Sequence, residues 1–324
     1  HWQIGHKSAA DYGKLAAETG KAMKAIDPEI ELIACGSSLS SMPTCPQWDM
    51  EVLEQAYEVI DYLALHQYYG GQEKGTKDFL AQSLDMEEYI KTIRSAAQVV
   101  KQKKHSDKNM KFSVDEWGVW AASATTVVKE AEKNAWQTAP SLSEQIYTME
   151  DALLFAEMQM AIVRNADVIK IACQSLLTNV SACIMTEKGG GLWLQTIYYP
   201  FYYFANYAHG VVLETVVSCE TYKSSQFEVP YLDVLAVWNK EEQEIAVFLV
   251  NRSETESIKC EACFQDFELN DVKMAVALYA EDKKMTNQFD HNAVVPRKNT
   301  SVSIQGNRCT VEAAPLSFHV VRLG

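Results

Sequence analysis

The sequence has little positive charge for its length. Its 324 residues include 29 Lys and Arg but 43 Asp and Glu, which gives a formal net charge of −14 at pH 7. Because binding to phosphates needs a basic surface, this balance argues against nucleic acid as a partner. It equally disfavours anionic membrane surfaces and anionic polymers, whereas a neutral ligand fits it.

Long apolar runs are also absent. No run reaches the roughly 18 residues that a membrane-spanning helix needs, so we expect no membrane association. The chain starts at His1, with neither an initiator Met nor the architecture of a signal peptide. We therefore expect a cytoplasmic protein of which this chain is a part.

Several chemical motifs are missing as well. No G-x-S-x-G, Walker or dinucleotide-binding glycine pattern occurs, so serine hydrolysis, phosphoryl transfer and dinucleotide chemistry lack support. The eight cysteines are not spaced as a disulfide framework, and we expect most to be reduced core residues. Cys260 and Cys263 form a lone C-x-x-C without the second pair or the histidines of a zinc site. We expect no metal and no cofactor.

Helical and strand patterns alternate over the first two-thirds of the chain. Four short apolar strands are predicted at residues 30–35, 61–66, 110–116 and 167–174. Helical periodicity is predicted at residues 8–26, 48–60, 86–104, 149–165 and 192–207. The first helix has Ser8 and Asp11 placed like a capping box. This alternation indicates a parallel sheet covered by helices on its outer face.

The pattern changes after Gly210. Segments 232–238, 244–250 and 317–322 alternate in polarity and are rich in β-branched residues, with polar turns and no helix between them. They predict an antiparallel β-sandwich. We therefore expect two domains, at residues 1–210 and 211–324.

The four predicted strands leave two architectures open. They could form a small doubly wound sheet or half of an eight-stranded (β/α)8 TIM barrel. Polar side chains follow or end all four strands: Ser37 and Ser38, His66 and Tyr68, Glu116, then Gln174 and Ser175. Strand C-termini build the active face of a barrel, which favours that fold. Four strands cannot close it, so we expect the missing half upstream of His1.

Glu116 is the best candidate for a catalytic group. It ends a predicted strand and is followed by Trp117 and Trp120, a setting that suits chemistry on a sugar ring. Such chemistry normally needs a second carboxylate, which this chain does not obviously supply. Asp115 is expected on the opposite side of the strand because side chains alternate. The alternative is a structural role, in which Glu116 is a strand-end carboxylate whose hydrogen bonds are made within the protein.

Other aromatic and polar residues can be interpreted as functional or as structural. His66 and Tyr68 share one face and could bind sugar hydroxyls or keep a nucleophile ionised, although a core histidine at a strand end is equally common. Trp120 could be a platform for a sugar face, with core packing as the safer interpretation. The aromatic run at residues 198–204 is expected to be the buried face of the last helix.

A set of short blocks resembles glycoside hydrolase family 51. In chain order, the blocks are Trp2-Gln3-Ile4-Gly5-His6-Lys7, Ala34-Cys35-Gly36-Ser37-Ser38, Leu65-His66-Gln67-Tyr68-Tyr69-Gly70, Asp78-Phe79-Leu80-Ala81, Asp115-Glu116-Trp117-Gly118-Val119-Trp120 and Ile184-Met185-Thr186-Glu187. The resemblance implies a retaining α-L-arabinofuranosidase, with a (β/α)8 barrel and a C-terminal β-sandwich. We therefore expect the second half of such a barrel here, followed by the sandwich.

The resemblance also implies roles for individual residues. Glu116 matches the catalytic nucleophile, at the end of the seventh strand. His66 and Tyr68 match active-site residues after the sixth strand, and Trp120 matches a tryptophan that borders the sugar subsite. The acid/base glutamate would lie in an Asn-Glu pair just before Trp2, outside this chain. The two carboxyl groups of a retaining pair are roughly 5–5.5 Å apart.

One position departs from the family. A sugar-contacting glutamine is common after the eighth strand, where this sequence has Leu176. Gln174 could take its place only if the local backbone shifts. Loss of that polar contact would weaken binding by about 1–3 kcal/mol.

Three hypotheses about the whole protein follow. The first is a retaining enzyme that releases terminal α-L-arabinofuranosyl residues from oligosaccharides. The second is a sugar-binding or scaffold protein that has the fold without the chemistry, which Leu176 and the absent acid/base glutamate favour. The third is a portion with no function alone. Because an open half-barrel exposes strand edges, we expect a homo-oligomer or a complementary N-terminal portion as partner.

Overall fold

The computed structural model describes residues 5–121, 124–133, 135–138, 140 and 143–324, so Trp2, Gln3 and Ile4 lie outside the described residues. The chain forms two compact units. The first comprises His1–Tyr68, Asp85–Trp117 and Asn165–Ser175, and the second comprises Tyr69–Leu84, Gly118–Arg164 and Leu176–Gly324. The predicted domain boundary between residues 210 and 211 stays a prediction.

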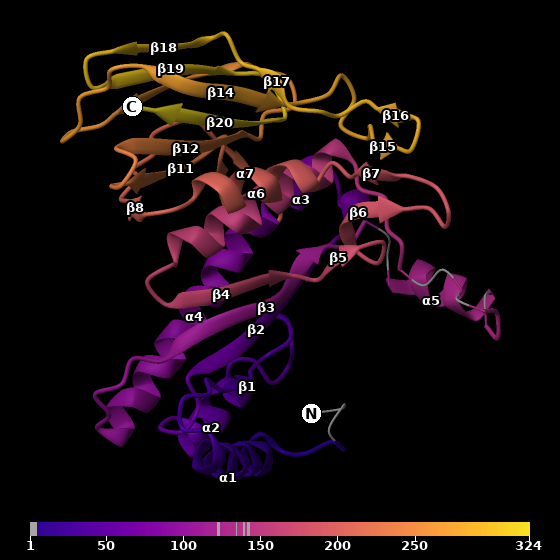
Figure 1. Cartoon of the computed structure of the whole chain (residues 1–324), viewed down its shortest axis with the longest axis vertical. Helices are drawn as coiled ribbons and strands as arrows, with labels where there is room; N and C mark the ends of the chain where they lie inside the picture. The colour runs from indigo at the N-terminus through magenta and orange to yellow at the C-terminus, as the bar shows by residue number, and fades with distance from the viewer. Residues whose placement is uncertain (1–4, 122–123, 134, 139, 141–142) are drawn as a thin grey trace. The chain divides into compact units, whose positions relative to one another are not determined.

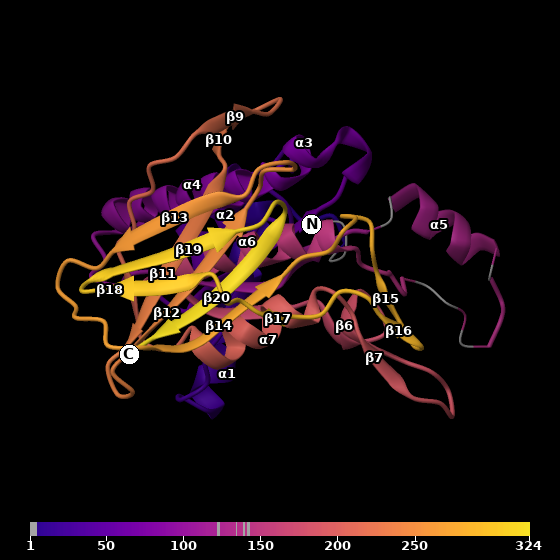
Figure 2. The same ribbon diagram turned by 90° about the horizontal axis from the view of Figure 1, so that it is seen from above.

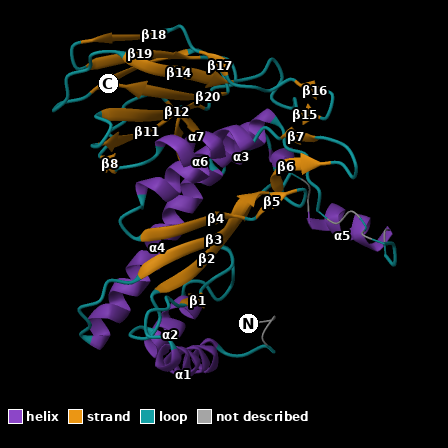
Figure 3. Ribbon diagram, viewed as in Figure 1, coloured by secondary structure: helices purple, strands orange, loops and turns teal. Residues whose placement is uncertain are grey.

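The first unit is built on a four-stranded sheet (Figures 1 and 3). Its strands follow the chain in the order β1 (Ile33–Cys35), β2 (Tyr62–Tyr69), β3 (Lys111–Val119) and β4 (Ile169–Gln174). Parallel pairing joins β1 to β2 and β3 to β4. Its helices are α1 (Ala9–Ile26), α2 (Gln47–Ala56) and most of α4 (Gln82–Lys104). The predicted alternation of helix and strand is thus confirmed here.

Burial explains why this sheet and its helices form. On the strands, Leu63, Leu65 and Phe112 are almost completely buried, and so are Ile93 and Val100 of α4. Removing such apolar surface from water is the main force that favours folding. At the start of α1 the Ser8 side chain accepts a hydrogen bond from the Asp11 amide at 3.1 Å, as the capping motif predicts.

Two strands are longer than the sequence predicts. Prediction ends β2 at His66 and β3 at Glu116, whereas the strands end at Tyr69 and Val119. The extension follows from pairing that single-strand patterns do not reveal, as when Trp117 pairs with Gln174 of β4. His66 and Glu116 therefore lie inside paired strands near their C-terminal ends.

Among the described residues, the second unit contains five more helical segments and a small sheet. The segments are a 3-10 turn (Gln72–Lys74), α3 (Thr76–Leu80), α5 (Ala124–Lys133), α6 (Met149–Arg164) and α7 (Tyr198–Tyr207). The small sheet has the order β5 (Leu176–Thr178), β6 (Ala182–Thr186) and β7 (Leu192–Leu194). The single helix predicted at residues 192–207 is wrong in its first part, because Leu192 and Leu194 pair with β6 as a strand.

The antiparallel strands predicted for the C-terminal part form a β-sandwich (Figure 2). One sheet has the order β17-β14-β20-β12-β11-β8 and the other β13-β19-β18. The bounds are β8 Val211–Leu213, β11 Leu232–Asn239, β12 Glu244–Asn251, β13 Ile258–Cys263, β14 Val272–Leu278, β17 Arg297–Lys298, β18 Val302–Gln305, β19 Arg308–Ala313 and β20 Ser317–Leu323. Short pairs are formed by β9 (Thr221–Lys223) with β10 (Glu228–Pro230) and by β15 (Asn287–Gln288) with β16 (His291–Asn292).

The central strands of the six-stranded sheet are buried on both faces. One face shares an apolar core with the three-stranded sheet, to which Val247, Leu249 and Val311 belong. On α7, Phe204 stacks on Phe248 of β12, with ring centroids 4.1 Å apart. As predicted, much of the aromatic run at residues 198–204 is buried against neighbouring elements, although Tyr202 is 40% exposed. None of the described helices is both long and apolar enough to cross a membrane.

Candidate active site

Two neighbouring strands of the first unit bring three of the predicted site residues together. His66 and Tyr68 lie on β2, and Glu116 lies on the adjacent strand β3. The main chain of β2 is fixed here, because the His66 amide donates a hydrogen bond to the Ser37 carbonyl at 3.3 Å. Side chains that are far apart in sequence therefore meet near the C-terminal ends of two strands.

The Glu116 carboxylate has a partner at each oxygen. The Tyr68 hydroxyl donates a hydrogen bond to Oε1 at 3.1 Å, and Nδ1 of His66 lies 3.4 Å from Oε2. The Glu116 side chain nevertheless remains 49% exposed. A carboxylate that is oriented by two neighbours and still open to solvent can approach an electrophilic carbon.

His66 contacts a second carboxylate. Its Nε2 lies 3.1 Å from Oδ1 of Asp115, so successive residues of β3 both reach the same ring. The prediction that Asp115 lies on the opposite face from Glu116 is wrong. The pairing of β3 with β4 shifts in register between Val114 and Trp117, and such an irregularity breaks the strict alternation of side chains.

These contacts change the protonation of both β2 side chains. The contact with Asp115 raises the pKa of His66 above its ordinary value of 6.5; burial opposes this shift, and the charges of Asp115 and Glu116 add to it. Burial also raises the pKa of Tyr68, and the nearby Glu116 charge raises it further. Tyr68 therefore stays a hydrogen-bond donor at neutral pH, and His66 keeps its positive charge to a higher pH than a free histidine does.

The ends of β1 and β4 complete the surroundings of this site within the first unit. Ser37 is buried after β1, where its hydroxyl and its amide both donate to the Asp49 carboxylate, at 2.5 and 2.8 Å. Gly36 is required there, since a Cβ at this position would lie 2.3 Å from the Ala64 carbonyl oxygen. Beyond β4, the Ser175 side chain hydrogen-bonds to the Tyr68 hydroxyl. Sequence patterns indicated Ser37 and Ser175 as strand-end residues but not these contacts.

The remaining predicted residues lie at the end of β4 or follow β3 and β4. Gln174 is the last residue of β4, half-buried and paired with Trp117. Trp120 and Leu176 belong to the second unit. There the Trp120 carbonyl accepts a hydrogen bond from the Gln72 side chain at 3.0 Å, and Leu176 is 50% exposed. Trp117 is only 1% exposed, so it packs in the core and is no surface for a ligand.

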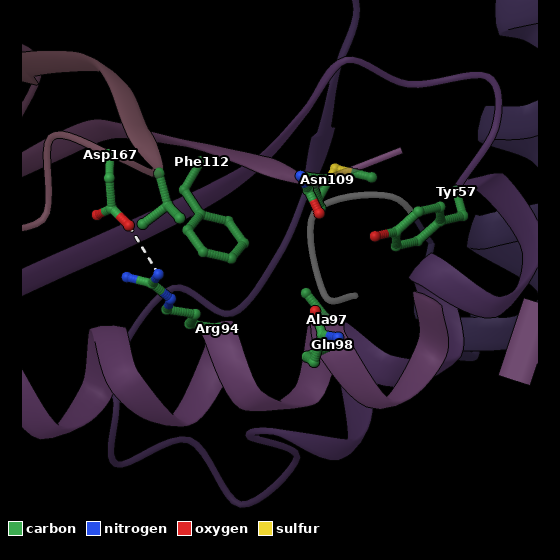
Figure 4. Close-up of a pocket in the computed structure, with 9 residues that line it drawn as sticks. Tyr57, Arg94, Ala97, Gln98, Asn109, Phe112 and Asp167 are labelled. Carbon is green, nitrogen blue, oxygen red and sulfur yellow. Dashed lines mark ion pairs between the residues drawn. The ribbon is translucent and has the colours of Figure 1, made fainter. Parts of the chain in front are cut away.

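A separate cavity lies at the other end of the first unit's sheet (Figure 4). Its volume is about 250 Å³, and its wall includes Phe112 near the start of β3 and Val168 just before β4. Arg94 and Asp167 form an ion pair of 2.7 Å at its edge. Catalytic groups of barrels gather at the C-terminal ends of the strands, so this cavity is not the candidate site.

The described residues contain no group of three or more His, Cys, Asp or Glu side chains arranged to hold a metal ion. The site combines an exposed carboxylate with a tyrosine hydroxyl and with a histidine that lies next to a second carboxylate. This combination suits nucleophilic attack by a carboxylate whose ionised form its neighbours stabilise.

Comparisons with known proteins agree on one family. Residues 115–317 match the model of the α-L-arabinofuranosidase C-terminal domain. The chain is 44% identical over 326 residues to an intracellular exo-α-(1→5)-L-arabinofuranosidase from Halalkalibacterium halodurans, covering 100% of this chain and 64% of that protein. A relative of the same description from Bacillus subtilis is 43% identical, with 99% and 64% covered. The chain thus spans about 64% of the length of these relatives.

Solved structures show the same relationship. The chain is similar to AbfB, a family 51 α-L-arabinofuranosidase from Bifidobacterium longum, with a TM-score of 0.91 and 30% identity over 99% of this chain and 64% of that one. An α-L-arabinofuranosidase from Thermotoga maritima shares the fold at 22% identity, with a TM-score of 0.81 and with 99% and 63% covered. The predicted fold class, the second half of a (β/α)8 barrel followed by an antiparallel β-sandwich, is confirmed.

Proposed function

The chain belongs to the α-L-arabinofuranosidases of glycoside hydrolase family 51, and on this premise we propose that the protein releases terminal α-L-arabinofuranosyl residues with retention of configuration. The observation that carries the proposal is the Glu116 carboxylate, which Tyr68 and His66 hold from its two oxygens while half of it stays exposed. We assign the role of nucleophile to Glu116.

The proposed reaction has two steps. Glu116 attacks the anomeric carbon, and the bond from that carbon to the leaving oxygen breaks, while a second glutamate protonates the oxygen. Water, deprotonated by the same second glutamate, then displaces Glu116 from the sugar. Tyr68 and His66 orient the attacking carboxylate and stabilise its ionised form before attack and after release. The second glutamate is proposed to lie outside this chain.

The rest of the substrate site is assigned by the same premise. We propose Trp120 as the aromatic border of the sugar subsite and Gln174 as a polar contact to the sugar. The exposed Leu176 replaces a polar side chain with an apolar one and would weaken binding by about 1–3 kcal/mol. Relatives are named for exo action on α-(1→5) linkages and, in Bifidobacterium longum, on α-(1→6) linkages, so the proposed substrate class is an oligosaccharide with a terminal arabinofuranosyl group.

The proposal also covers location and assembly. Several relatives are named intracellular enzymes, which supports a cytoplasmic protein. In the four-stranded sheet as described, β1 and β4 are the two edge strands, and unpaired edges favour pairing with further strands. We propose that residues 1–210 form one half of the barrel and 211–324 the sandwich domain. The partner would be a complementary N-terminal portion or, in a homo-oligomer, another copy.

Replacement of Glu116 tests this function. In the complete protein, Glu116→Ala should lower turnover of an aryl α-L-arabinofuranoside by more than about a thousandfold, because the covalent route is lost. Added azide should restore release of the aryl group by attacking the anomeric carbon itself, which gives an arabinofuranosyl azide of inverted configuration. Turnover close to that of the unsubstituted protein would contradict the assignment of Glu116.

A second candidate function rests on Leu176. A sugar-binding or scaffold protein of this fold would need no complete catalytic pair, and an apolar residue at a usual glutamine position fits reduced catalysis. Calorimetry with arabinose separates the two functions. Binding without hydrolysis by the complete, folded protein would favour the sugar-binding alternative.

A further inference from the structure

Asp115 is a carboxylate next to Glu116 that the proposed reaction does not use. It is the immediate sequence neighbour of Glu116, and its side chain is only 31% exposed. It lies 3.1 Å from Nε2 of His66, while Nδ1 of the same ring lies 3.4 Å from Glu116. The three side chains thus form a row in which His66 stands between two carboxylates.

The protonation state of His66 determines whether its contacts with both carboxylates are favourable. A neutral imidazole has one N–H and one lone pair, so one of its nitrogens would turn a lone pair toward a carboxylate oxygen. A protonated ring carries an N–H on both nitrogens and a positive charge that attracts both carboxylates. We propose that Asp115 is a positioning residue that acts through His66, keeping an N–H on Nδ1 directed at the Glu116 carboxylate.

The surroundings of His66 support this arrangement. Asp115 and Glu116, both on β3, are the charged groups that act on the His66 ring within the described residues, and both favour its protonated form. On β2 itself, Tyr68 contacts Glu116 instead. From the residues that follow β1, the Ser37 carbonyl accepts a hydrogen bond from the His66 main-chain amide. Asp115 provides the nearer of the two ring contacts.

The inference rests on the proposed role of Glu116, and pH-dependent kinetics can test the two separately. In the complete protein, Asp115→Asn keeps the shape of the side chain but removes its charge. His66 should then lose its proton at lower pH, and the alkaline limb of kcat/KM should move down by about one pH unit. The deficit should be smallest at acid pH and grow as the pH rises. A purely structural role would give a deficit that does not depend on pH.

A double-mutant cycle shows whether Asp115 acts through His66. Alone, Asp115→Asn should reduce kcat/KM at least tenfold at the alkaline end of the profile. In a His66→Gln background the same change should add little, because the residue through which it acts is already gone. The matched control is Asp167→Asn, an exposed carboxylate of the same unit outside the site, which should leave the profile unchanged.

Each result has a defined meaning. A pH profile of Asp115→Asn that overlays the profile of the unsubstituted protein, or equal losses in both backgrounds, would overturn the role of Asp115. Glu116 would keep its role if Glu116→Ala is inactive in the same assay. Should Asp115→Asn fail to fold, NMR titration of His66 in the unsubstituted protein decides instead. A midpoint at or below about 6.5 would overturn the inference, and a higher midpoint would support it.

Discussion

Glu116 in the first unit and Glu157 in the second each have a nitrogen group as partner, but in different surroundings. Glu116 is half exposed, with Tyr68 and His66 at its oxygens. Glu157 is completely buried on α6, and its Oε1 lies 2.5 Å from Nε of Arg252, whose side chain is 2% exposed. Asp233 also contacts Arg252, at 3.0 Å.

Burial determines what each cluster can do. The site around Glu116 can admit a ligand, and neighbouring hydrogen bonds orient its carboxylate. The cluster around Glu157 ties α6 to β11 and to the residue after β12. Because Glu157 and Arg252 are buried, no ligand can enter there, and the charged groups depend on each other in place of solvent. In this protein, a carboxylate is therefore a candidate for function where neighbouring groups hold it and solvent can still reach it. Substitutions around Glu116 should therefore lower activity, whereas substitutions around Glu157 should lower stability.

The largest effect on stability is expected for Arg252→Ala. This change would leave buried acidic groups without their shared cation, which costs about 3–5 kcal/mol of unfolding free energy. Urea unfolding of the complete protein measures it. Arg94→Ala, which breaks the exposed pair with Asp167, is the matched control and should cost less than about 1 kcal/mol. Equal losses in the two variants would remove the distinction between buried and exposed pairs.

A second effect on stability, with a defined direction, is expected from pH. Burial raises the pKa of Glu157 to about 8, although Arg252 opposes the shift. In the unfolded chain the group loses its proton near 4.5, so between about pH 4.5 and pH 8 the folded state binds more protons. The free energy of unfolding should therefore fall as the pH rises through this range. Unfolding curves of Glu157→Gln should show a flatter pH dependence, and an unchanged slope would contradict the raised pKa.

A packing test in the first unit should have an intermediate effect. Gly36→Ala places a methyl group against the Ala64 carbonyl and 2.7 Å from Oδ1 of Asp49. We expect a loss of about 1–3 kcal/mol in unfolding free energy. Gly306→Ala is a useful contrast, because its position has a positive φ but no atom within 4 Å of the added Cβ. A loss in Gly36→Ala no larger than that in Gly306→Ala would contradict the steric clash at residue 36.

The smallest effect is expected for the titration of His66. Its pKa is raised in the folded state by Asp115, so its contribution to stability is complete below the unfolded pKa of about 6.5. That contribution is lost as the pH rises through the folded pKa. Because the ring is one-third exposed, we expect less than about 1 kcal/mol. Comparison of His66→Gln with the unsubstituted protein at pH 6 and pH 9 measures it, and a difference that increases with pH would have the wrong sign.

Much of the architecture was predictable because its signals are local. The capping residue Ser8, the helical periodicity and the apolar strands predict the half-barrel, and the alternating segments after Gly210 predict the sandwich. The strand extensions to Tyr69 and Val119 were not predictable, because they depend on pairing with neighbouring strands. The strand at Leu192–Leu194 was missed for the same reason, since its partner is β6.

The candidate site was predictable in its members but not in its contacts. The order of residues on strands indicated Glu116, His66 and Tyr68 as neighbours. The place of Asp115 was not predictable, because it follows from a register shift between β3 and β4. Gln174, Trp120 and Leu176 stay predictions as substrate contacts. The structural role of Glu157 had no signal in the sequence, since its partners Arg252 and Asp233 are far along the chain.

One measurement tests the role of Glu116 most directly. The complete protein would be treated with a mechanism-based arabinofuranoside inactivator that traps the covalent glycosyl-enzyme, and its peptides would be analysed by mass spectrometry. We predict that the trapped sugar is found on Glu116 alone, and that the label is lost in Glu116→Gln. A label on a different carboxylate, or inverted product with no label at all, would contradict the assignment of Glu116 as the nucleophile.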